Sequence, residues 1–416
     1  MAKKIVLLKP NGKVKQYNTL QDLSAIEPPL WLAIYAKKFY HKGTAVEIID
    51  AEVENYTEDE TVQAVLAKHP DRVIILSTGS HPSAHIQQKD SATRLDILLS
   101  FHVPVEIHDH LPFNPCDYPS PFWELLPMPK YRAHNWHCWG RDSRIPYGVV
   151  FTSVGCPFNC NFCCIKDFYG QKYQQREVKD VIYDFYRMKE LGIKNIKIMD
   201  ELFTFNPTRV EEICKKIIEV DGDFNIWTYG RIDIVNPPML EIMRKAGIRW
   251  IAYGIESGND EIRKNILKGN FNKDRIRNII EMTKSYGIYI VGNYMFGFWD
   301  DTLETMQETI DFAQELNCEY ANFYCTVAYP GSKLYDEMLE QQVGLPTEFS
   351  QYAQYNKNFK PLPTKTLKSK EVLTFRDKAF TQYFTNTRYL EMMQKTFGDK
   401  VVQEIRDMVT IKLERN

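Results

Sequence analysis

Residues 153–163 read SVGCPFNCNFC and place three cysteines, Cys156, Cys160 and Cys163, within eight positions. The C-x3-C-x2-C spacing puts three thiolates on one short loop, and thiolates are the ligands that hold iron–sulfur clusters. A [4Fe–4S] cluster ordinarily takes four such ligands, so three leave one iron open. A structural zinc site closes with four ligands, commonly two cysteine pairs, and the sequence offers no matching second pair. The spacing therefore favours a cluster with an open iron.

The cysteine loop follows the first of six strand-like runs that alternate with helix-like runs. Such alternation predicts parallel strands, and six units predict a partial barrel with its site on loops at the carboxyl ends of the strands. The expected strands are 148–152, 195–199, 225–228, 250–254, 289–294 and 321–324, and the expected helices are 178–191, 207–220, 237–246, 273–286, 303–316 and 334–341.

The residues before the barrel show a second, shorter alternation. Strands are expected at 5–8, 46–50, 72–77 and 103–108, and helices at 29–39, 58–68 and 92–100. We therefore predict an α/β chain: a doubly wound parallel sheet over 1–110 and a partial barrel over 147–341. Recurring prolines make 111–146 an irregular linker, and 342–416 is expected to form a helical cap over the barrel mouth.

The cysteine loop resembles the signature of the radical S-adenosylmethionine (SAM) superfamily, Cys-x3-Cys-aromatic-x-Cys, with Phe162 at the aromatic position. The resemblance covers roughly residues 121–337. It implies that Cys156, Cys160 and Cys163 hold a [4Fe–4S] cluster, and that the methionine end of SAM chelates its open iron. Reductive cleavage of SAM then yields a 5′-deoxyadenosyl radical that abstracts a substrate hydrogen. An electron donor such as flavodoxin or ferredoxin is implied as a partner.

Three strand-end segments also resemble SAM-contacting elements of that superfamily: MDELF at 199–203, WTYGRID at 227–233 and YGIESG at 253–258. The acidic pair of the first would contact the SAM amino group, although acids are also favoured at a helix start. The arginine of the second would lie near the SAM carboxylate, or else form a surface ion pair with Asp233. The expected cofactor-binding residues are Phe162, Asp200, Glu201, Arg231, Gly254, Glu256 and Ser257.

The amino-terminal region resembles the cobalamin (B12)-binding domain fused to one branch of the superfamily. The resemblance lies in EPPLWLA at 27–33, VEIID at 46–50 and the linker segment YPSPFWELLP at 118–127. The chain lacks an Asp-x-His-x-x-Gly cobalt-ligand motif, and it enters the linker where the family adds another helix and strand. The domain is thus shortened. Four histidines near strand ends could approach a cobalt but are more ordinary as polar loop residues: His81, His85, His108 and His110.

Charge and composition narrow the remaining classes. Lysine and arginine number 52 against 54 acidic residues, a net charge of −2 that gives no electrostatic case for nucleic acid. The apolar run at 5–8 is too short for a signal peptide or a membrane span. We therefore expect a cytoplasmic protein with no membrane span, and a small-molecule or peptide substrate.

The leading interpretation is a radical SAM enzyme that carries out cobalamin-dependent methylation at carbon. One alternative keeps the radical chemistry but makes the cobalamin domain vestigial, giving a dehydration, epimerisation, oxidation or rearrangement. A further alternative is a non-catalytic Fe–S protein. The segments around Asp200, Arg231 and Glu256 argue against the last, because a redox carrier needs no SAM site.

Overall fold

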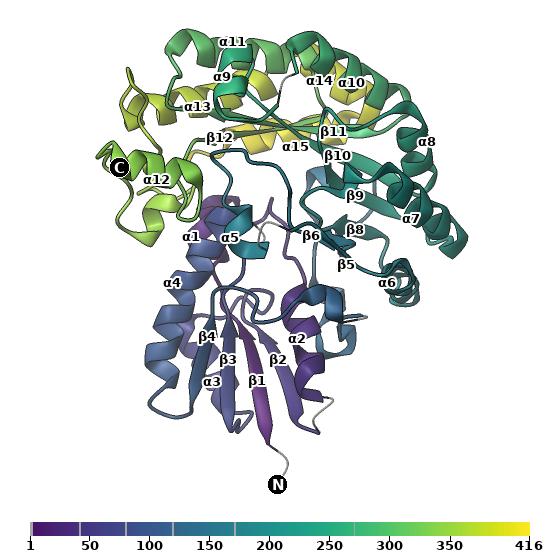
Figure 1. The fold of residues 1–416 in the computed structure, drawn as a ribbon, viewed down its shortest axis with the longest axis vertical. Helices are drawn as coiled ribbons and strands as arrows, with labels where there is room; N and C mark the ends of the chain where they lie inside the picture. The colour runs from purple at the N-terminus through teal and green to yellow at the C-terminus, as the bar shows by residue number, and fades with distance from the viewer. Residues whose placement is uncertain (1–2, 41–42, 80, 119, 170–171, 270) are drawn as a thin grey trace.

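Two parallel sheets organise the chain (Figure 1). The structure is a computed structural model that describes residues 3–40, 43–79, 81–118, 120–169, 172–269 and 271–416. The smaller sheet has four strands in the order β2-β1-β3-β4, and the larger has six in the order β12-β11-β10-β9-β8-β5. All neighbours within both sheets are parallel. The predicted α/β class with two sheets is confirmed.

The small sheet is covered on both faces, which explains its unbroken apolar strands. Ile5 and Leu7 join the core shared with α2 and the barrel, whereas Val6 and Leu8 join a second core against α3 and α4. Its elements are β1 (Lys4–Lys9), α1 (Lys13–Tyr17), α2 (Leu30–Tyr40), β2 (Ala45–Asp50), α3 (Glu58–Leu66), β3 (Arg72–Leu76), α4 (Pro82–Leu99) and β4 (Val105–His108).

In the large sheet each strand lies beside the next strand in the chain, and helices cover its outer face (Figure 1). The strands are β5 (Tyr147–Val150), β8 (Asn195–Ile198), β9 (Asn225–Gly230), β10 (Ile248–Glu256), β11 (Tyr289–Phe296) and β12 (Tyr320–Cys325). The helices between and after them are α6 (Val178–Glu190), α7 (Pro207–Val220), α8 (Pro237–Lys245), α9 (Asp260–Asn265), α10 (Lys273–Ser285), α11 (Leu303–Leu316) and α12 (Lys333–Glu340).

The proline-rich segment forms short 3-10 turns and plugs the amino-terminal end of the barrel. The ring of Trp136 lies 5.4 Å from that of Trp227 and 5.2 Å from that of Trp250. His137 lies beside them with Nε2 2.9 Å from the carbonyl oxygen of Asn225. Burial of these aromatic rings ties an otherwise irregular segment to the first residues of β9 and β10.

The expected carboxyl-terminal helices are present, and three of their residues, Arg376, Phe380 and Met408, line the cavity described below. Helix α13 (Ser369–Phe384) packs on the edge strand β12, and α14 (Thr387–Phe397) and α15 (Asp399–Thr410) pack on α13 and on each other. The hydroxyls of Tyr383 and Tyr389 donate to the carbonyls of Cys318 and Glu319, just before that strand. Phe397 stacks on Trp250. These helices therefore close the open side of the sheet, where aromatic side chains need cover.

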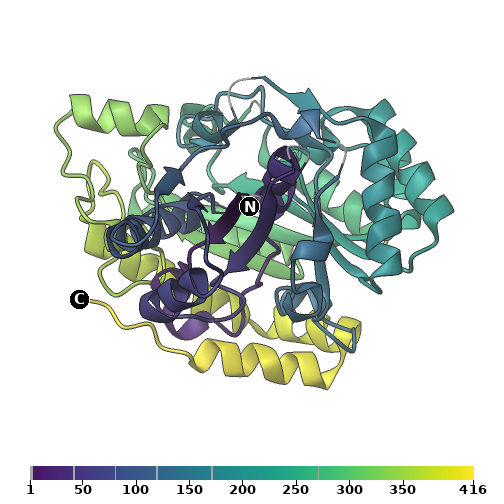
Figure 2. The ribbon, with the colours of Figure 1, turned by 90° about the horizontal axis from the view of Figure 1, so that it is seen from below.

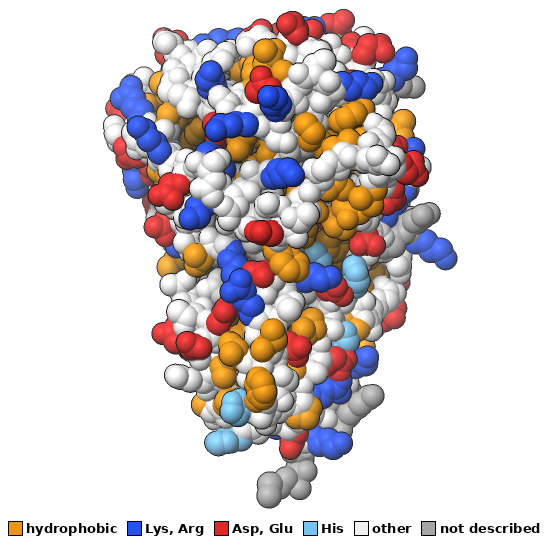
Figure 3. Space-filling view, turned by 90° about the vertical axis from the view of Figure 1, so that its left-hand side faces the viewer, with side chains coloured by type: hydrophobic (Ala, Val, Ile, Leu, Met, Phe, Trp, Pro, Cys, Tyr) orange, Lys and Arg blue, Asp and Glu red, His pale blue; other side chains and the backbone are white. Residues whose placement is uncertain are grey.

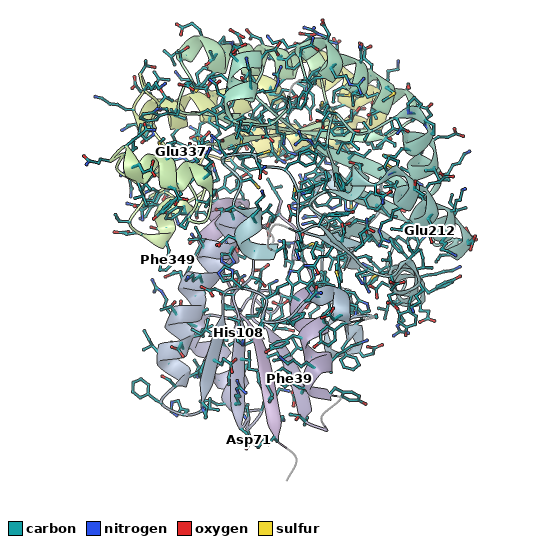
Figure 4. All side chains as sticks on the ribbon, in the orientation of Figure 1. Phe39, Asp71, His108, Glu212, Glu337 and Phe349 are labelled. Atoms are coloured by element: carbon teal, nitrogen blue, oxygen red, sulfur yellow. The ribbon has the colours of Figure 1, made fainter. Side chains whose placement is uncertain are left out.

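The small sheet faces the mouth of the barrel. Figure 2 shows it in front of the barrel, between the outer helices and the carboxyl-terminal helices. Figure 4 labels Asp71, just before β3, at the far end of this sheet, and His108, the last residue of β4, at the end toward the barrel. The carboxyl ends of the small sheet therefore point into the barrel, which is where ligands of parallel sheets bind.

The surface drawn in Figure 3 shows basic and acidic side chains interspersed, with no extended basic area on that face. Among the described residues, no helix combines the length and apolar character needed to cross a membrane.

Candidate active site

A cavity of about 590 Å³ lies between the two sheets. Its wall includes Lys9 and Leu76 at the carboxyl ends of the small sheet, and Lys197, Tyr229 and Gly254 from strands of the large sheet. This volume is within the range of small-molecule sites, about 300–1,000 Å³. The cavity is therefore built by both parts of the chain together.

The cysteine loop forms one side of this cavity. Cys156, Cys160 and Cys163 all line it, and the amide of Cys163 donates to the carbonyl of Cys160 across a tight turn. Gly155 has φ +84°, and a Cβ there would lie 2.4 Å from the carbonyl oxygen of Lys172. Only glycine combines that backbone conformation with so close an approach.

The three thiols suit a cluster better than a single ion. In the described part of the chain, no three His, Cys, Asp or Glu side chains lie close enough to share one metal ion. A cubane needs no such convergence, because each cysteine binds a different iron, and a soft thiolate set is what iron–sulfur clusters take. Partial burial raises the pKa of Cys156, so cluster binding at this thiol must displace a proton. The neighbouring Cys164 is buried beside them.

Two of the expected SAM contacts lie behind the cavity wall instead. Asp200 is 1% exposed, and it accepts hydrogen bonds from the Thr152 amide (2.6 Å), the Thr152 hydroxyl (2.5 Å) and the Ser153 hydroxyl (2.6 Å). Ser257 lies 3.2 Å from the Thr309 hydroxyl and is fully buried. Neither lines the cavity. In this structure both side chains hold neighbouring loops of the site by hydrogen bonds.

Glu201, next to Asp200, does line the cavity. Its carboxylate forms no hydrogen bond or ion pair with any described residue. Burial is the main reason that its pKa is raised to about 7; the charge of Asp200 adds to this, and that of Lys197 opposes it. A buried carboxylate of this kind gains from a cation in the cavity, since an opposite charge favours its ionised form.

Arg231 lines the cavity just after β9 and is only 8% exposed. The alternative of a surface ion pair with Asp233 therefore does not describe this arginine. Its guanidinium lies 3.8 Å from the ring centroid of Phe158, a residue of the cysteine loop. Its Nε lies 2.7 Å from Asp233 Oδ1, and its Nη2 donates to the carbonyl of Lys268. The pair with Asp233 exists, but inside the site.

Glu256 ends β10 with φ +66° and turns its carboxylate toward the cavity. Oε1 lies 2.7 Å from Lys268 Nζ. A Cβ on Gly254 would lie 2.4 Å from the same oxygen, so a larger residue there would displace the Glu256–Lys268 pair. Phe162 packs against Phe298 and lies within 6.0 Å of the Lys268 ammonium. Sequence reasoning missed Lys268, because a lone lysine after a short helix carries no motif.

Two ion pairs at the cavity were also not predicted: one joins the barrel to the amino-terminal part of the chain, and the other lies within that part. Lys197 Nζ on β8 lies 2.9 Å from Glu27 Oε1, and Lys9 Nζ lies 3.4 Å from Glu52 Oε1. All four line the cavity. Their partners come from segments far apart in the chain, so no local pattern could have indicated them.

Of the four histidines weighed as cobalt ligands, only His81 lines the cavity. It begins α4, where its Nδ1 accepts from the amide of Ala84 at 3.2 Å. His85 packs edge-on against Phe168, and His108 pairs with Glu106. In this structure, therefore, His81 caps a helix, His85 packs against an aromatic ring and His108 pairs with an acid.

Comparison with known proteins adds family information to this geometry. Residues 150–313 match the family model described as the radical SAM superfamily. An uncharacterized methyltransferase of Pyrococcus horikoshii is 30% identical over 278 residues, covering 67% of this chain and 58% of that protein. The cytidylyl-2-hydroxyethylphosphonate methyltransferase of Streptomyces wedmorensis is 28% identical, covering 58% of this chain and 45% of that protein. The chain thus spans about half the length of these relatives.

Two solved structures share the whole arrangement. TsrM from Kitasatospora setae, a radical SAM methyltransferase solved with cobalamin and a [4Fe–4S] cluster, aligns with a TM-score of 0.67 at 13% identity, covering 98% of this chain and all of that chain. OxsB, a cobalamin-dependent SAM radical enzyme, aligns with a TM-score of 0.64 at 12% identity, covering 98% and 70%. At these identities the likeness establishes the fold.

Proposed function

We propose that this chain, whose residues 150–313 form a radical SAM domain, cleaves SAM reductively at a [4Fe–4S] cluster and methylates a carbon of a small molecule with the help of cobalamin. One observation carries the proposal. The three cysteines and the strand-end groups Glu201, Arg231 and Glu256 share one cavity, which also reaches the carboxyl ends of the small sheet.

The chain's own groups suit the methionine end and the ribose of SAM. The ionised Glu201 would accept from the ammonium by a charge-assisted hydrogen bond, and Arg231 would face the carboxylate. Glu256, held by Lys268, would accept from a ribose hydroxyl. The cluster, when bound, supplies the electron that breaks a carbon–sulfur bond of SAM. The protein supplies position and keeps water out.

The proposal that cobalamin takes part rests on the part of the cavity that lies between the small sheet and the cysteine loop. Its wall combines the aromatic faces of Trp31 and Tyr169 with the strand-end residues Leu76, Thr78 and Gly79. A flat, amide-rimmed ring suits such a wall of apolar faces and backbone groups. The relatives named as methyltransferases support methyl transfer as the reaction.

A second candidate is cobalamin-independent radical chemistry, a dehydration, epimerisation, oxidation or rearrangement. It is favoured by the small sheet, which stops at β4 before the chain enters the proline-rich segment. In addition, Gly79 approaches α4 so closely that a Cβ would lie 2.3 Å from the His85 amide nitrogen. The backbone of α4 therefore covers part of the surface at the carboxyl end of β3, where a cobalamin ring would otherwise lie.

Cobalt retention together with product analysis separates the two candidates. The protein is reconstituted anaerobically with iron and sulfide, loaded with hydroxocobalamin, desalted and assayed with isotopically labelled SAM. Near-stoichiometric cobalt and transfer of the labelled methyl group are expected. Formation of 5′-deoxyadenosine without retained cobalt would reject methylation and leave the second candidate, and no SAM cleavage at all would reject both.

We further propose a cytoplasmic setting with flavodoxin or ferredoxin as the electron donor. An open-iron cluster needs a reducing environment, and the nine cysteines are all free thiols in the structure. Activity with a reduced flavodoxin, compared with that with dithionite, tests the donor.

A further inference from the structure

Helix α1 presents three polar side chains to the cavity, Lys13, Gln16 and Tyr17, and Gln16 already accepts a hydrogen bond from Ser83. The other two, Lys13 and Tyr17, are four residues apart and therefore share one face of the helix. Lys13 is only 6% exposed, and its ammonium forms no hydrogen bond or ion pair with any described residue. A buried, unpaired charge is costly, so this ammonium is poised for an anion that enters the cavity.

The other cations of the cavity are already engaged. Among the lysines and arginines that line it in the described ranges, each except Lys13 has a side-chain partner on the protein. The pairs are Lys9 with Glu52, Lys166 with Asn159, Lys197 with Glu27, Arg231 with Asp233, Lys268 with Glu256 and Arg376 with Asp377.

Tyr17 is oriented to donate into the same space. The Ala84 amide donates to Nδ1 of His81 (3.2 Å), which places the ring proton on Nε2. Nε2 lies 3.1 Å from the Tyr17 oxygen and thus donates to it. Burial keeps His81 neutral by lowering its pKa to about 4. The hydroxyl hydrogen of Tyr17 is then left for an acceptor in the cavity.

We propose that α1 binds a carboxylate of the substrate, with Lys13 as its ammonium partner and Tyr17 as its hydroxyl donor. This deepens the function proposed above and rests on it, because it takes the cavity to be the substrate site. Lys13 supplies one buried positive charge, which balances a monoanion, whereas a phosphate dianion would bring a second negative charge that Lys13 does not compensate. Tyr355, whose ring stacks on that of Tyr17 at 6.0 Å, also lines the cavity, so an apolar or aromatic skeleton next to the carboxylate would meet aromatic side chains.

The charges around Lys13 set the pH range of this binding. Burial is the main reason that its pKa is lowered to about 8; the positive charges of Arg132 and Arg144 add to this, and the acids Glu52 and Asp22 oppose it. The ammonium is therefore present at pH 7 and is lost above pH 8. Carboxylate affinity should fall as the pH rises through about 8.

A matched pair of probes tests the assignment. 4-Phenylbutyrate and 4-phenylbutyramide are titrated calorimetrically into the reconstituted, SAM-loaded protein at pH 7. The carboxylate should bind about tenfold tighter than the amide, the value of one charge-assisted hydrogen bond. Lys13→Met should remove this advantage, and Tyr17→Phe should reduce it several-fold. The control Lys15→Met removes a charge from the same helix outside the cavity, where Lys15 pairs with Glu58 and Asp90, and should leave it intact.

The carboxylate assignment is wrong if the two probes bind equally, or if Lys13→Met and Lys15→Met weaken binding alike. Inorganic phosphate is the competing anion. If phosphate binds more tightly than phenylbutyrate and loses this affinity in Lys13→Met, the site is a phosphate site and the carboxylate assignment is wrong. The wild-type pH profile is a second measurement if Lys13→Met fails to fold, and a flat profile from pH 6 to 9 would count against the proposal. Formation of 5′-deoxyadenosine is assayed separately. If none forms while carboxylate binding stays intact and depends on Lys13, the proposed function is wrong but the carboxylate site is not.

Discussion

At the scale of single residues, neighbours in the sequence have different tasks. Asp200 is turned inward to hold Thr152 and Ser153, whereas Glu201 faces the cavity and forms no hydrogen bond or ion pair with the residues that the structure describes. Asp200 is buried, whereas Glu201 is half-buried at the cavity wall. The hydrogen bonds that each receives decide which one is available to a ligand.

The cysteine loop yields the first prediction. Replacing Cys156, Cys160 and Cys163 together by alanine should abolish the cluster's broad visible absorbance and all SAM cleavage, because no other described thiols share the loop except Cys164. Iron and sulfide analysis after anaerobic reconstitution measures this. Cys164→Ala is the control and should keep its iron, since three ligands suffice. A full iron content in the triple variant would refute the assignment.

The contrast between Glu201 and Asp200 yields the second prediction. Glu201→Gln should weaken SAM binding about tenfold with iron content unchanged, because one charge-assisted hydrogen bond to the ammonium is lost. Asp200→Asn should instead lower cluster loading, since it disturbs the support of the cysteine loop. Equilibrium dialysis with SAM and iron analysis distinguish them. The reverse pattern would return the SAM contact to Asp200.

At the scale of elements, the loop that carries the cysteines is held from behind by a buried ion pair. Arg176, after β7 (Gln174–Gln175), donates to the carbonyl of Phe151 and pairs with Asp184 of α6 at 2.8 Å, with both side chains fully buried. Ser120 donates to the same carboxylate at 2.6 Å. Helix α6, the linker and the strand end are thus joined at one point.

The third prediction concerns this pair. Asp184→Ala should lower the free energy of unfolding by about 3–5 kcal/mol, because it removes one member of a fully buried ion pair. Glu211→Ala, which breaks an exposed pair with Lys215 on α7, is the control and should cost about 0–1 kcal/mol. Chemical denaturation measures both. Equal losses of unfolding free energy in the two variants would show that the buried pair stabilises the protein no more than the exposed one.

At the scale of the whole molecule, the small sheet and the barrel share one apolar core. Ile5, Leu7 and Ile74 of the small sheet belong to the same buried cluster as Trp136 and Tyr147 at the barrel. The Glu27–Lys197 pair adds a polar tie across the cavity. Neither part therefore completes its core without the other.

The fourth prediction follows from this shared core. Thermal unfolding should show one cooperative transition for both parts, because separating them would expose the common apolar surface. Calorimetry on the full chain tests this, and agreement of the calorimetric and van't Hoff enthalpies is the criterion. Two resolved transitions would show that the small sheet unfolds on its own.

The sequence by itself determined the βα alternation, both parallel sheets and the cysteine loop, because these depend on local periodicity and close spacing. Tertiary structure alone decided that Asp200 and Ser257 stand behind the wall, that Lys268 meets Glu256, and that the last helices close the side of the sheet. It also brought Lys13 of the unpredicted helix α1 to the cavity. Such contacts join residues distant in the chain, and their energies depend on burial and partners that no local pattern contains.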